Sequence, residues 1–301
     1  MAGDDLDAEA LGERRHLVSL AFRMLGTVAE AEDAVQETYA RWYRLSEEER
    51  EAIESPRGWL TKVAGRVCLD VLGSARMRRE RYVGQWLPEP VPPTAFADPL
   101  DRVTLDDTVS SALLVVLESM TPAERVVFVL HEVFAMPFPE VAEVVGRSPA
   151  ACRQLATSAR RRVQAAPVRT VPREEHDRVV TAFAAACQSG DLAALIATLD
   201  EHVVLRSDGG GIVRAARNPV FGSDRVARFV LGVIEKQPEV DVLPQQTPDG
   251  LGFAMWLDGR IIGLVTLEVA GDLVTNLRLQ LNPEKLRLWN PASGVSPDSG
   301  P

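Results

Sequence analysis

The sequence has few of the features that mark membrane, secreted or metal-binding proteins. No apolar run is long enough to span a bilayer, and the acidic N-terminus, MAGDDLDAEA, lacks the basic start of a secretory signal. Only three cysteines occur among 301 residues, and they form no C-x-x-C pair. Cys68, Cys152 and Cys187 each lie in an apolar helical pattern, which indicates reduced core residues. We therefore expect a cytoplasmic protein that has no contact with a membrane and needs no cofactor or metal.

Positive charge is also scarce, because the net charge is −10. This balance argues against a protein that coats nucleic acid through bulk charge. The basic residues are nevertheless clustered. Residues 70–82 hold four arginines against two acids, and residues 147–162 hold five arginines and no acid. Two basic segments in an acidic chain indicate contact with DNA at two places and a main affinity that comes from a protein partner.

Helical periodicity dominates the first half of the chain. Apolar residues recur every three or four positions along residues 29–45. A second stripe follows Ser55 and Pro56, which read as an N-cap and a proline at the first helical position. The proline-rich residues 85–104 cannot be helical throughout, so an extended linker is predicted there.

A helix-turn-helix pattern follows the linker. A short helix is predicted over residues 138–145, then a turn at Gly146, then a basic helix that starts at Ser148 and ends near Val163. One side of this basic helix is apolar and should be buried. The opposite side carries residues that can reach DNA: Arg153, Gln154, Thr157, Ser158, Arg160 and Arg161.

The pattern changes again after Pro172. Two helices are predicted over residues 174–188 and 191–199, and β-rich stretches separated by Asp-Gly and Gly-Asp turns follow. A further helix over residues 223–236 lies between strands. Helices followed by a curved antiparallel sheet indicate an α+β cone or half-barrel. The turn-rich residues 291–301 are predicted to be a disordered tail.

Several stretches together resemble the extracytoplasmic-function sigma factors. Residues 31–43 (AEDAVQETYARWY) look like the family's polymerase-binding helix, and residues 56–70 (PRGWLTKVAGRVCLD) look like its promoter −10 helix. The −35-reading domain is matched by three further stretches: 121–125, 138–142 and 148–162. The resemblance implies a promoter-reading subunit of RNA polymerase that contacts the β′ and β subunits and promoter DNA, and leaves the chemistry to polymerase.

The same resemblance implies an architecture and a set of roles. Two all-α domains are expected, a helical bundle over 8–84 and a helix-turn-helix domain over 105–166. The candidate polymerase-binding residues are Asp33, Gln36, Glu37 and Arg41. The candidate −10 residues are Lys62, Arg66, Arg76, Arg78 and Arg79. The −35 candidates are the six exposed residues of the basic helix named above.

A simpler interpretation stands beside each of these roles, since charged helix faces are commonly just solvated. Many relatives carry Asn where this chain has Arg66. Arg66 therefore either reads a different base or pairs with Asp70, one helical turn away.

Residues 173–290 resemble the SnoaL-like branch of the NTF2-like cones. Three short motifs, WLPEP (86–90), DGGG (208–211) and NPEKL (282–286), look like the sigma subgroup with a fused SnoaL-like domain in place of a separate anti-sigma factor. The resemblance implies that this domain tunes sigma activity by docking on the sigma domains or on the linker. The candidate regulatory residues are Trp86, Leu87, Pro88, Asp208, Gly209, Gly210, Asn282, Pro283 and Lys285.

Other functions stay open at this point. A helix-turn-helix regulator with a ligand-sensing cone is one, although it has no use for the helices of residues 29–82. A cyclase-like enzyme with a DNA-binding leader is another, and its acid–base candidates would be His202, Asp208, Asp258 and Asp272. No catalytic-triad or metal-ligand spacing supports the enzyme. An unknown small ligand in the cone is compatible with the sigma-factor interpretation.

Overall fold

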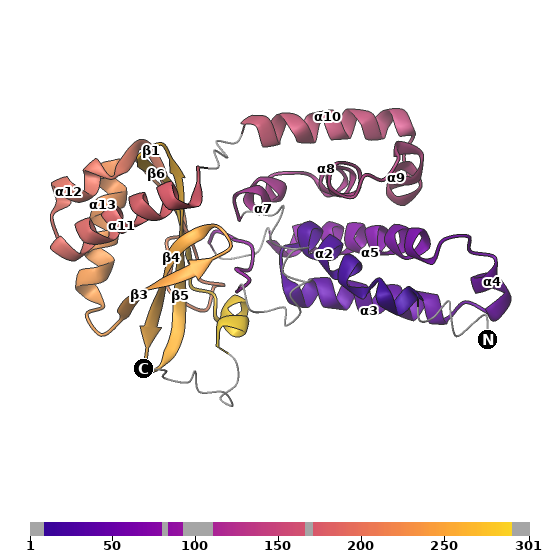
Figure 1. Cartoon of the computed structure of the whole chain (residues 1–301), viewed down its shortest axis with the longest axis horizontal. Helices are drawn as coiled ribbons and strands as arrows, with labels where there is room; N and C mark the ends of the chain where they lie inside the picture. Colours follow the sequence, from indigo (N-terminus) through magenta and orange to yellow (C-terminus); the bar gives the residue numbers. More distant parts are fainter. Residues whose placement is uncertain (1–8, 80–83, 93–110, 166–170, 291–301) are drawn as a thin grey trace. The chain divides into compact units, whose positions relative to one another are not determined.

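The structure, a computed structural model, describes four stretches of the 301-residue chain: 9–79, 84–92, 111–165 and 171–290. The chain forms two compact units. Unit 1 comprises residues 1–81 and 98–168, and unit 2 comprises residues 82–97 and 169–301. Residues 84–92, hereafter the linker segment, therefore belong to unit 2, although unit 1 contains the chain on both sides of them (Figure 1).

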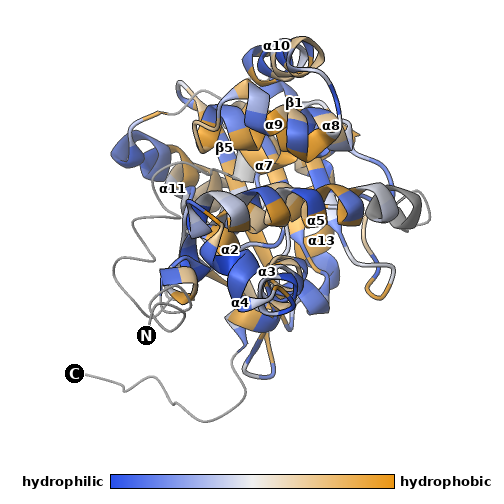
Figure 2. Cartoon of the chain, turned by 90° about the vertical axis from the view of Figure 1, so that its right-hand side faces the viewer, coloured by the Kyte–Doolittle hydropathy of each residue, from blue (hydrophilic) through white to orange (hydrophobic). Residues whose placement is uncertain are grey.

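The first half of unit 1 is a helical bundle whose boundaries follow local capping signals. Its helices are α2 (Arg14–Leu25), α3 (Val28–Tyr43), α4 (Glu47–Glu51) and α5 (Pro56–Arg79). Gly26 ends α2 in the left-handed conformation, Thr27 caps α3, and Ser46 forms a reciprocal capping box on α4. Figure 2 shows hydrophilic and hydrophobic residues alternating around these helices, as expected when amphipathic helices share a core.

The second half of unit 1 contains the helix-turn-helix. Its elements are α7 (Ser111–Glu118), α8 (Pro122–Phe128), the π-helical η1 (Val129–Val133), α9 (Phe138–Val145) and α10 (Pro149–Ala165). Thr121 and Glu124 form the predicted capping box, and Gly146 ends α9 with a φ of 67°. The predicted helices over 138–145 and from Ser148 are both confirmed.

The two halves of unit 1 pack on each other through α5. Gly65 faces Val144 of α9 and Leu130 of η1, and a Cβ atom at this position would lie 3.0 Å from Val144 Cγ1. A side chain at this position would therefore require Val144 and Leu130 to shift by a few tenths of an ångström. Arg125 of α8 reaches in the other direction and donates to the carbonyl of Met24 at 2.9 Å.

Unit 2 is a six-stranded sheet with helices on one face. The helices are α11 (Arg173–Ser189), α12 (Leu192–Ala197) and α13 (Ser223–Lys236), and a 3-10 helix, η2 (Pro283–Trp289), follows the last strand. The strands are β1 (Leu199–Asp208), β2 (Val220–Phe221), β3 (Asp241–Thr247), β4 (Gly250–Leu257), β5 (Arg260–Ala270) and β6 (Leu273–Gln280). In Figure 1, η2 lies on the other side of the sheet from α11, α12 and α13.

The strand order is β2-β1-β6-β5-β4-β3, and only the β1–β6 pair is parallel. Register shifts occur in the β1–β6, β4–β5 and β5–β6 pairs, and such irregularities bend a sheet. The main core lies between the helices and the sheet, around Phe183, Leu195 and Leu205. The predicted class, two all-α parts followed by an α+β cone, is confirmed.

Several details differ from the sequence predictions. The helix expected over 191–199 ends at Ala197, because Leu199 already begins β1. Strand β3 was not predicted, since Pro244 interrupts its β pattern; the proline is tolerated because β3 is an edge strand. The predicted tail 291–301 lies outside the described residues. No helix in the described ranges has the length and apolar character needed to cross a membrane.

Candidate functional site

The face of α3 predicted to bind polymerase is polar and accessible. Asp33 and Gln36 are exposed, whereas Glu37 and Arg41 are half-buried. Arg41 Nε donates to Glu37 Oε1 at 2.9 Å, and this bond lowers the pKa of the Glu37 carboxyl. The opposite face of α3 packs into the core through Trp42 and its neighbours. All four candidates therefore lie outside the bundle core, with both signs of charge next to each other.

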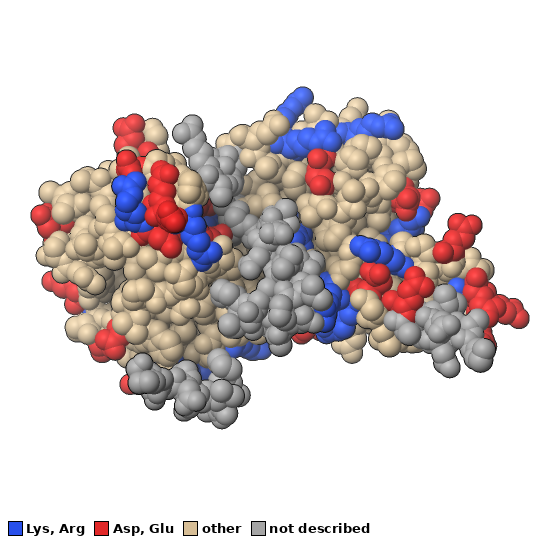
Figure 3. Space-filling model, viewed as in Figure 1, with Lys and Arg blue, Asp and Glu red and all other residues tan. Residues whose placement is uncertain are grey.

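Helix α10 carries a row of exposed basic side chains. Cys152, Ala156 and Ala159 are buried against the rest of the domain. Five of the six predicted DNA-binding residues are exposed: Arg153, Gln154, Thr157, Arg160 and Arg161. Figure 3 shows Lys and Arg side chains lined up over α10. Arginine and glutamine on an exposed helix are the residue types that read guanine and adenine in the major groove.

Three of the six candidates on α10, Arg153, Ser158 and Arg160, also have side-chain partners on other helices of the domain. Ser158 is half-buried, and its hydroxyl donates to Glu124 Oε1 at 2.6 Å. Arg160 pairs with Glu132, with Nη2 and Oε1 2.6 Å apart. These contacts fasten α10 to α8 and η1. The Arg153 guanidinium lies 5.5 Å from the centroid of the Phe138 ring on α9. Within the described residues, Gln154, Thr157 and Arg161 make no such contact with another helix; Thr157 donates to the carbonyl of Arg153 within α10 at 2.9 Å.

The predicted −10 residues on α5 are engaged by α9. Lys62 Nζ lies 3.0 Å from Glu143 Oε2 and 3.3 Å from Glu140 Oε2. Arg66 donates to the backbone carbonyl of Glu143 at 3.2 Å, and no ion pair joins it to Asp70 within the described ranges. In place of the pair with Asp70 that was one alternative for Arg66, the structure therefore shows a bond to the Glu143 backbone, which the sequence did not indicate. The side chains of Arg76, Arg78 and Arg79 lie outside the described residues.

The most buried polar site lies in unit 2, where Asp208 contacts the linker segment. Asp208 ends β1 and is completely buried. The backbone N–H of Leu87 donates to Asp208 Oδ2 at 2.9 Å, and Lys285 Nζ lies 2.7 Å from the same oxygen. Lys285 also donates to the carbonyl of Leu87, and its Nζ lies 4.0 Å from the centroid of the Trp86 ring. The ammonium group is therefore enclosed by a carboxylate, a carbonyl and an aromatic face.

Two more side chains fasten the linker segment farther along. Gln280 donates to the carbonyl of Pro88 at 3.2 Å, and the indole N–H of Trp289 donates to the carbonyl of Pro90 at 2.7 Å. Leu87, Pro88 and Glu89 are buried. Sequence reasoning missed Gln280 and Trp289 as contact residues. The signal for Trp289 was a lone tryptophan near the end of the domain, whereas nothing in the local pattern marks Gln280.

The glycines of the DGGG motif allow the close approach of the NPEKL motif. Gly210 has a φ of 67°, and a Cβ atom there would lie 2.6 Å from the amide carbon of Asn282. A Cβ atom at Gly209 would lie 2.2 Å from the carbonyl oxygen of Val213. Asn282 itself caps η2, and Pro283 is the exposed first residue of that helix. The three motifs that are separate in the sequence therefore meet around Asp208.

The acid–base candidates for an enzyme are not brought together. His202 has a side chain 87% exposed, Asp272 pairs with Arg178 at the surface, and Asp258 lies in a turn with a φ of 50°. Asp208 is bonded to Lys285. Within the described residues, no group of three or more His, Cys, Asp or Glu side chains could hold a metal ion.

A helical bundle, a helix-turn-helix with an exposed basic helix, and a further domain that binds the linker between them define a modular DNA-binding transcription factor. Residues 12–80 match the family Sigma-70 region 2, and residues 110–163 match Sigma-70, region 4. The chain belongs to the extracytoplasmic-function (ECF) RNA polymerase sigma factors, which direct promoter-specific initiation of transcription and bind RNA polymerase and promoter DNA.

Relatives cover both the sigma domains and the C-terminal domain. The ECF RNA polymerase sigma factor SigJ of Mycobacterium tuberculosis is 46% identical over 226 residues, which are 74% of this chain and 71% of SigJ. The probable ECF sigma factor SigI of the same species is 37% identical over 94% of this chain and 95% of its own length. The crystal structure of M. tuberculosis SigJ superposes with a TM-score of 0.72 at 38% identity, covering 93% of this chain and 97% of that one.

Proposed function

We propose that the C-terminal domain regulates this sigma factor by binding the linker segment between its two DNA-binding domains. The observation that supports the proposal is the buried pair of Asp208 and Lys285, which together bond both the N–H and the carbonyl of Leu87. The two DNA-binding domains must reach two promoter elements at once. A domain that fixes the linker restricts the path between them, so it acts in place of a separate anti-sigma factor.

The sigma part of the proposal assigns a partner to each face. Asp33, Gln36, Glu37 and Arg41 of α3 bind the β′ subunit of core polymerase, and region 4 contacts β. The exposed face of α10 reads the −35 element. Arg153 and Gln154 contact bases, and Arg160 and Arg161 contact phosphates, which position the helix without specifying sequence. Thr157 and Ser158 also contact the −35 element. Ser158 can do so only after its hydroxyl gives up its hydrogen bond to Glu124.

The −10 element is read from α5. Lys62 and Arg66 contact the DNA after they leave Glu140 and Glu143, and the arginines at 76, 78 and 79 extend the basic surface. Single-stranded promoter DNA is held by such basic surfaces together with aromatic stacking. The protein has no catalysis of its own, and it works in the cytoplasm, where bacterial polymerase acts.

Reconstituted transcription tests the regulatory role. Purified full-length protein is added to sigma-free core polymerase on DNA from upstream of its own operon, with Asp208→Asn, Lys285→Met and Trp86→Ala variants. Because all three loosen the same segment, we expect them to shift the output in the same direction. The matched control is Arg225→Met, which removes an exposed basic residue of the same domain that lies outside both the linker site and the large cavity of unit 2.

A double-mutant cycle then separates a shared role from independent ones. The proposal expects Trp86→Ala and Lys285→Met to be strongly non-additive, since the ammonium group and the ring are in contact. Fully additive effects on transcription, or unchanged output from every variant, would refute regulation through the linker segment while leaving the sigma-factor family assignment intact.

A further inference from the structure

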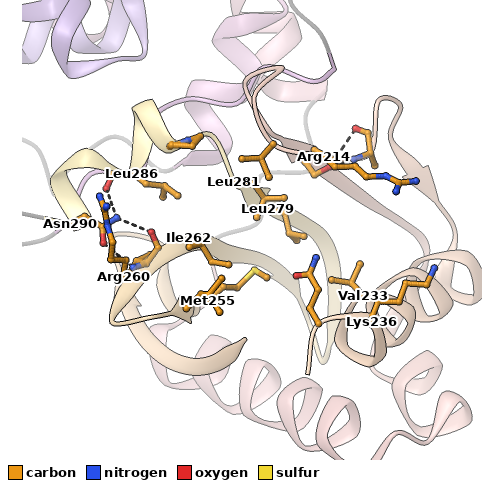
Figure 4. A pocket seen from close by; sticks show the side chains of 18 of the residues that line it. Arg214, Val233, Lys236, Met255, Arg260, Ile262, Leu279, Leu281, Leu286 and Asn290 are labelled. Atoms are coloured by element: carbon orange, nitrogen blue, oxygen red, sulfur yellow. Dashed lines mark hydrogen bonds between the residues drawn. The ribbon is translucent and has the colours of Figure 1, made fainter. Parts of the chain in front are cut away.

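Unit 2 contains a large cavity that the linker site does not use. Its volume is about 1080 Å³, slightly above the roughly 300–1,000 Å³ that ligand pockets usually occupy. The walls come from α13, from the strands β4, β5 and β6, from the loop after Gly211, and from η2. Figure 4 shows apolar side chains in the middle of this group, among them Leu279, Leu281 and Met255.

The charged residues of the cavity are nearly all basic. Arg214, Lys236, Arg260 and Arg287 line it, with Asp258 as the one acid in the lining. This is unusual in a chain with a net charge of −10. The side chains of these four basic residues have no hydrogen-bond or ion-pair partner among the described residues. In Figure 4, Arg260 lies at one end of the apolar group and Arg214 and Lys236 lie at the other.

An apolar interior with cations at its ends is complementary to one chemical class. The body of such a ligand gains from leaving water, and its acid group gains a charge-assisted hydrogen bond at the rim. A neutral apolar molecule would make no ionic contact with the cations, and a small inorganic anion would not cover the apolar walls. The chemistry of the lining therefore selects an apolar molecule that carries a carboxylate or a similar acid group.

The cavity and the linker site share one element, η2. Leu286 and Arg287 line the cavity, whereas Lys285 and Trp289 bond to the linker segment. Leu286 and Trp289 also pack together with Ile261 in one buried cluster. If η2 leaves its place, the cavity loses part of its wall and the linker segment loses its ammonium partner. A ligand that needs this wall binds the docked state of η2 more tightly and must shift the equilibrium toward it.

We propose that the cavity binds an apolar molecule bearing an acid group, and that this binding strengthens the attachment of the linker segment through η2. The binding of this ligand is inferred from the cavity alone. The coupling to the linker segment rests on the proposed regulatory role of the linker site. Because coupling is reciprocal, variants that loosen the linker segment should also weaken the binding of the ligand.

Binding is measured first, on the full-length protein and without transcription. The probes are dodecanoate and 1-pyrenebutyrate, each compared with its uncharged methyl ester, so that straight-chain and aromatic acids are distinguished. The acids should bind about tenfold more tightly than their esters, as expected for a charge-assisted bond. Equal affinity of acid and ester, or no binding of either acid at its solubility limit, would overturn the proposal.

Matched variants locate the site. Arg214→Gln with Lys236→Gln should weaken the acid by about tenfold and leave the ester unchanged. The control pair is Arg217→Gln with Arg225→Gln, which removes two exposed charges from the same loop and the same helix outside the cavity lining. An equal loss in the control pair would show attraction by net charge alone. Val233→Trp fills the cavity and should abolish binding of both probes at an unchanged melting temperature.

Hydrogen exchange tests the coupling. The amide of Leu87 donates to Asp208, so its exchange rate reports directly on the attachment of the linker segment. Saturating ligand should slow this exchange several-fold, and Lys285→Met, which loosens the linker segment, should weaken the binding of the ligand. Tight binding with an unchanged exchange rate at Leu87 would overturn the proposed coupling, whereas the proposed binding site would stand. Unchanged transcription despite slower exchange would instead count against the regulatory role.

Discussion

Two contacts in this protein restrain segments that are expected to move, and they differ in their burial. In unit 2, Asp208 and Lys285 bind the linker segment, with side chains 0% and 7% exposed. In unit 1, Lys62 of α5 pairs with Glu140 and Glu143 of α9, and the side chain of Glu143 is 59% exposed. The first contact is desolvated and geometrically complete, whereas the second is a surface ion pair.

The difference indicates which contact is a lasting part of the fold and which one is easily exchanged. Removing one partner of a buried pair leaves an uncompensated charge, whereas exposed pairs contribute about 0.2–1 kcal/mol. Lys62 can therefore leave α9 at little cost, as the proposed contact with DNA phosphate requires. The linker segment leaves unit 2 only when several strong bonds break together, which is compatible with the proposed regulatory role of this contact.

Breaking the buried pair should have the largest effect. Lys285→Met leaves the Asp208 carboxylate buried without its ammonium partner, and the expected loss is about 3–5 kcal/mol of unfolding free energy. The measurement is urea unfolding of the full-length protein, followed by the fluorescence of its five tryptophans. The control is Asp272→Asn, which breaks the exposed pair with Arg178 and should cost at most about 1 kcal/mol. Similar losses in both variants would show that the buried pair stabilises the protein no more than an exposed pair does.

Promoter specificity should depend on the exposed face of α10 to a smaller degree. Arg153→Ala or Gln154→Ala should lower the affinity of the holoenzyme for its cognate −35 element by about 1–3 kcal/mol and relax specificity at one base pair. Arg161→Ala should instead weaken all sequences alike and reduce the salt dependence. Competition binding with single-base variants of the promoter distinguishes the two. If Arg153→Ala lowered the affinity for all promoter sequences equally, Arg153 would be assigned to a phosphate contact.

Releasing Lys62 should have a smaller effect, of the opposite sign. Glu140→Gln with Glu143→Gln removes the carboxylates that pair with Lys62, so promoter affinity should rise by up to about 1 kcal/mol. Filter binding of the holoenzyme at two salt concentrations measures the gain, and the exposed Glu47→Gln with Glu48→Gln serves as a control for net charge. A loss of affinity would mean that α9 positions Lys62 for DNA and does not withhold it.

A pH dependence of stability should arise in unit 1 from His16. Burial, followed by the nearby Arg57 and Arg23, lowers the pKa of His16 from 6.5 to about 4. The folded state therefore holds His16 neutral, so the unfolded state binds the proton first as the pH falls. Stability should be complete above pH 6.5 and decrease toward pH 4.

The comparison of His16→Gln with His202→Gln isolates the contribution of His16 to the pH dependence of stability. His16 lies between Thr61, Arg57 and the ring of Phe134, whereas the His202 side chain is 87% exposed. Urea midpoints at pH 7 and pH 5 should converge in His16→Gln and remain separated in His202→Gln. Identical pH profiles in the two variants would show that His16 is not the group that titrates.

Much of the secondary structure could be predicted because its signals are local. The Thr121–Glu124 capping box, the left-handed Gly146 and the helix over 223–236 all depend on residues within one or two turns of each other. The amphipathic pattern of α10 likewise indicated which side is buried. Where a local rule and the tertiary context disagreed, as at Pro244 in β3, the sheet edge decided the outcome.

The sequence by itself determined the helices, the class of each domain and the exposed basic face of α10, because short-range periodicity and capping encode these features. Only the tertiary structure decided the partners of the long-range sites. Lys62 meets Glu143 across 81 residues of chain, and Lys285 meets Leu87 across 198. No periodicity links such positions, so their pairing depends on which surfaces the packing of helices and sheet brings together. Burial then makes one of these contacts strong and leaves the other weak.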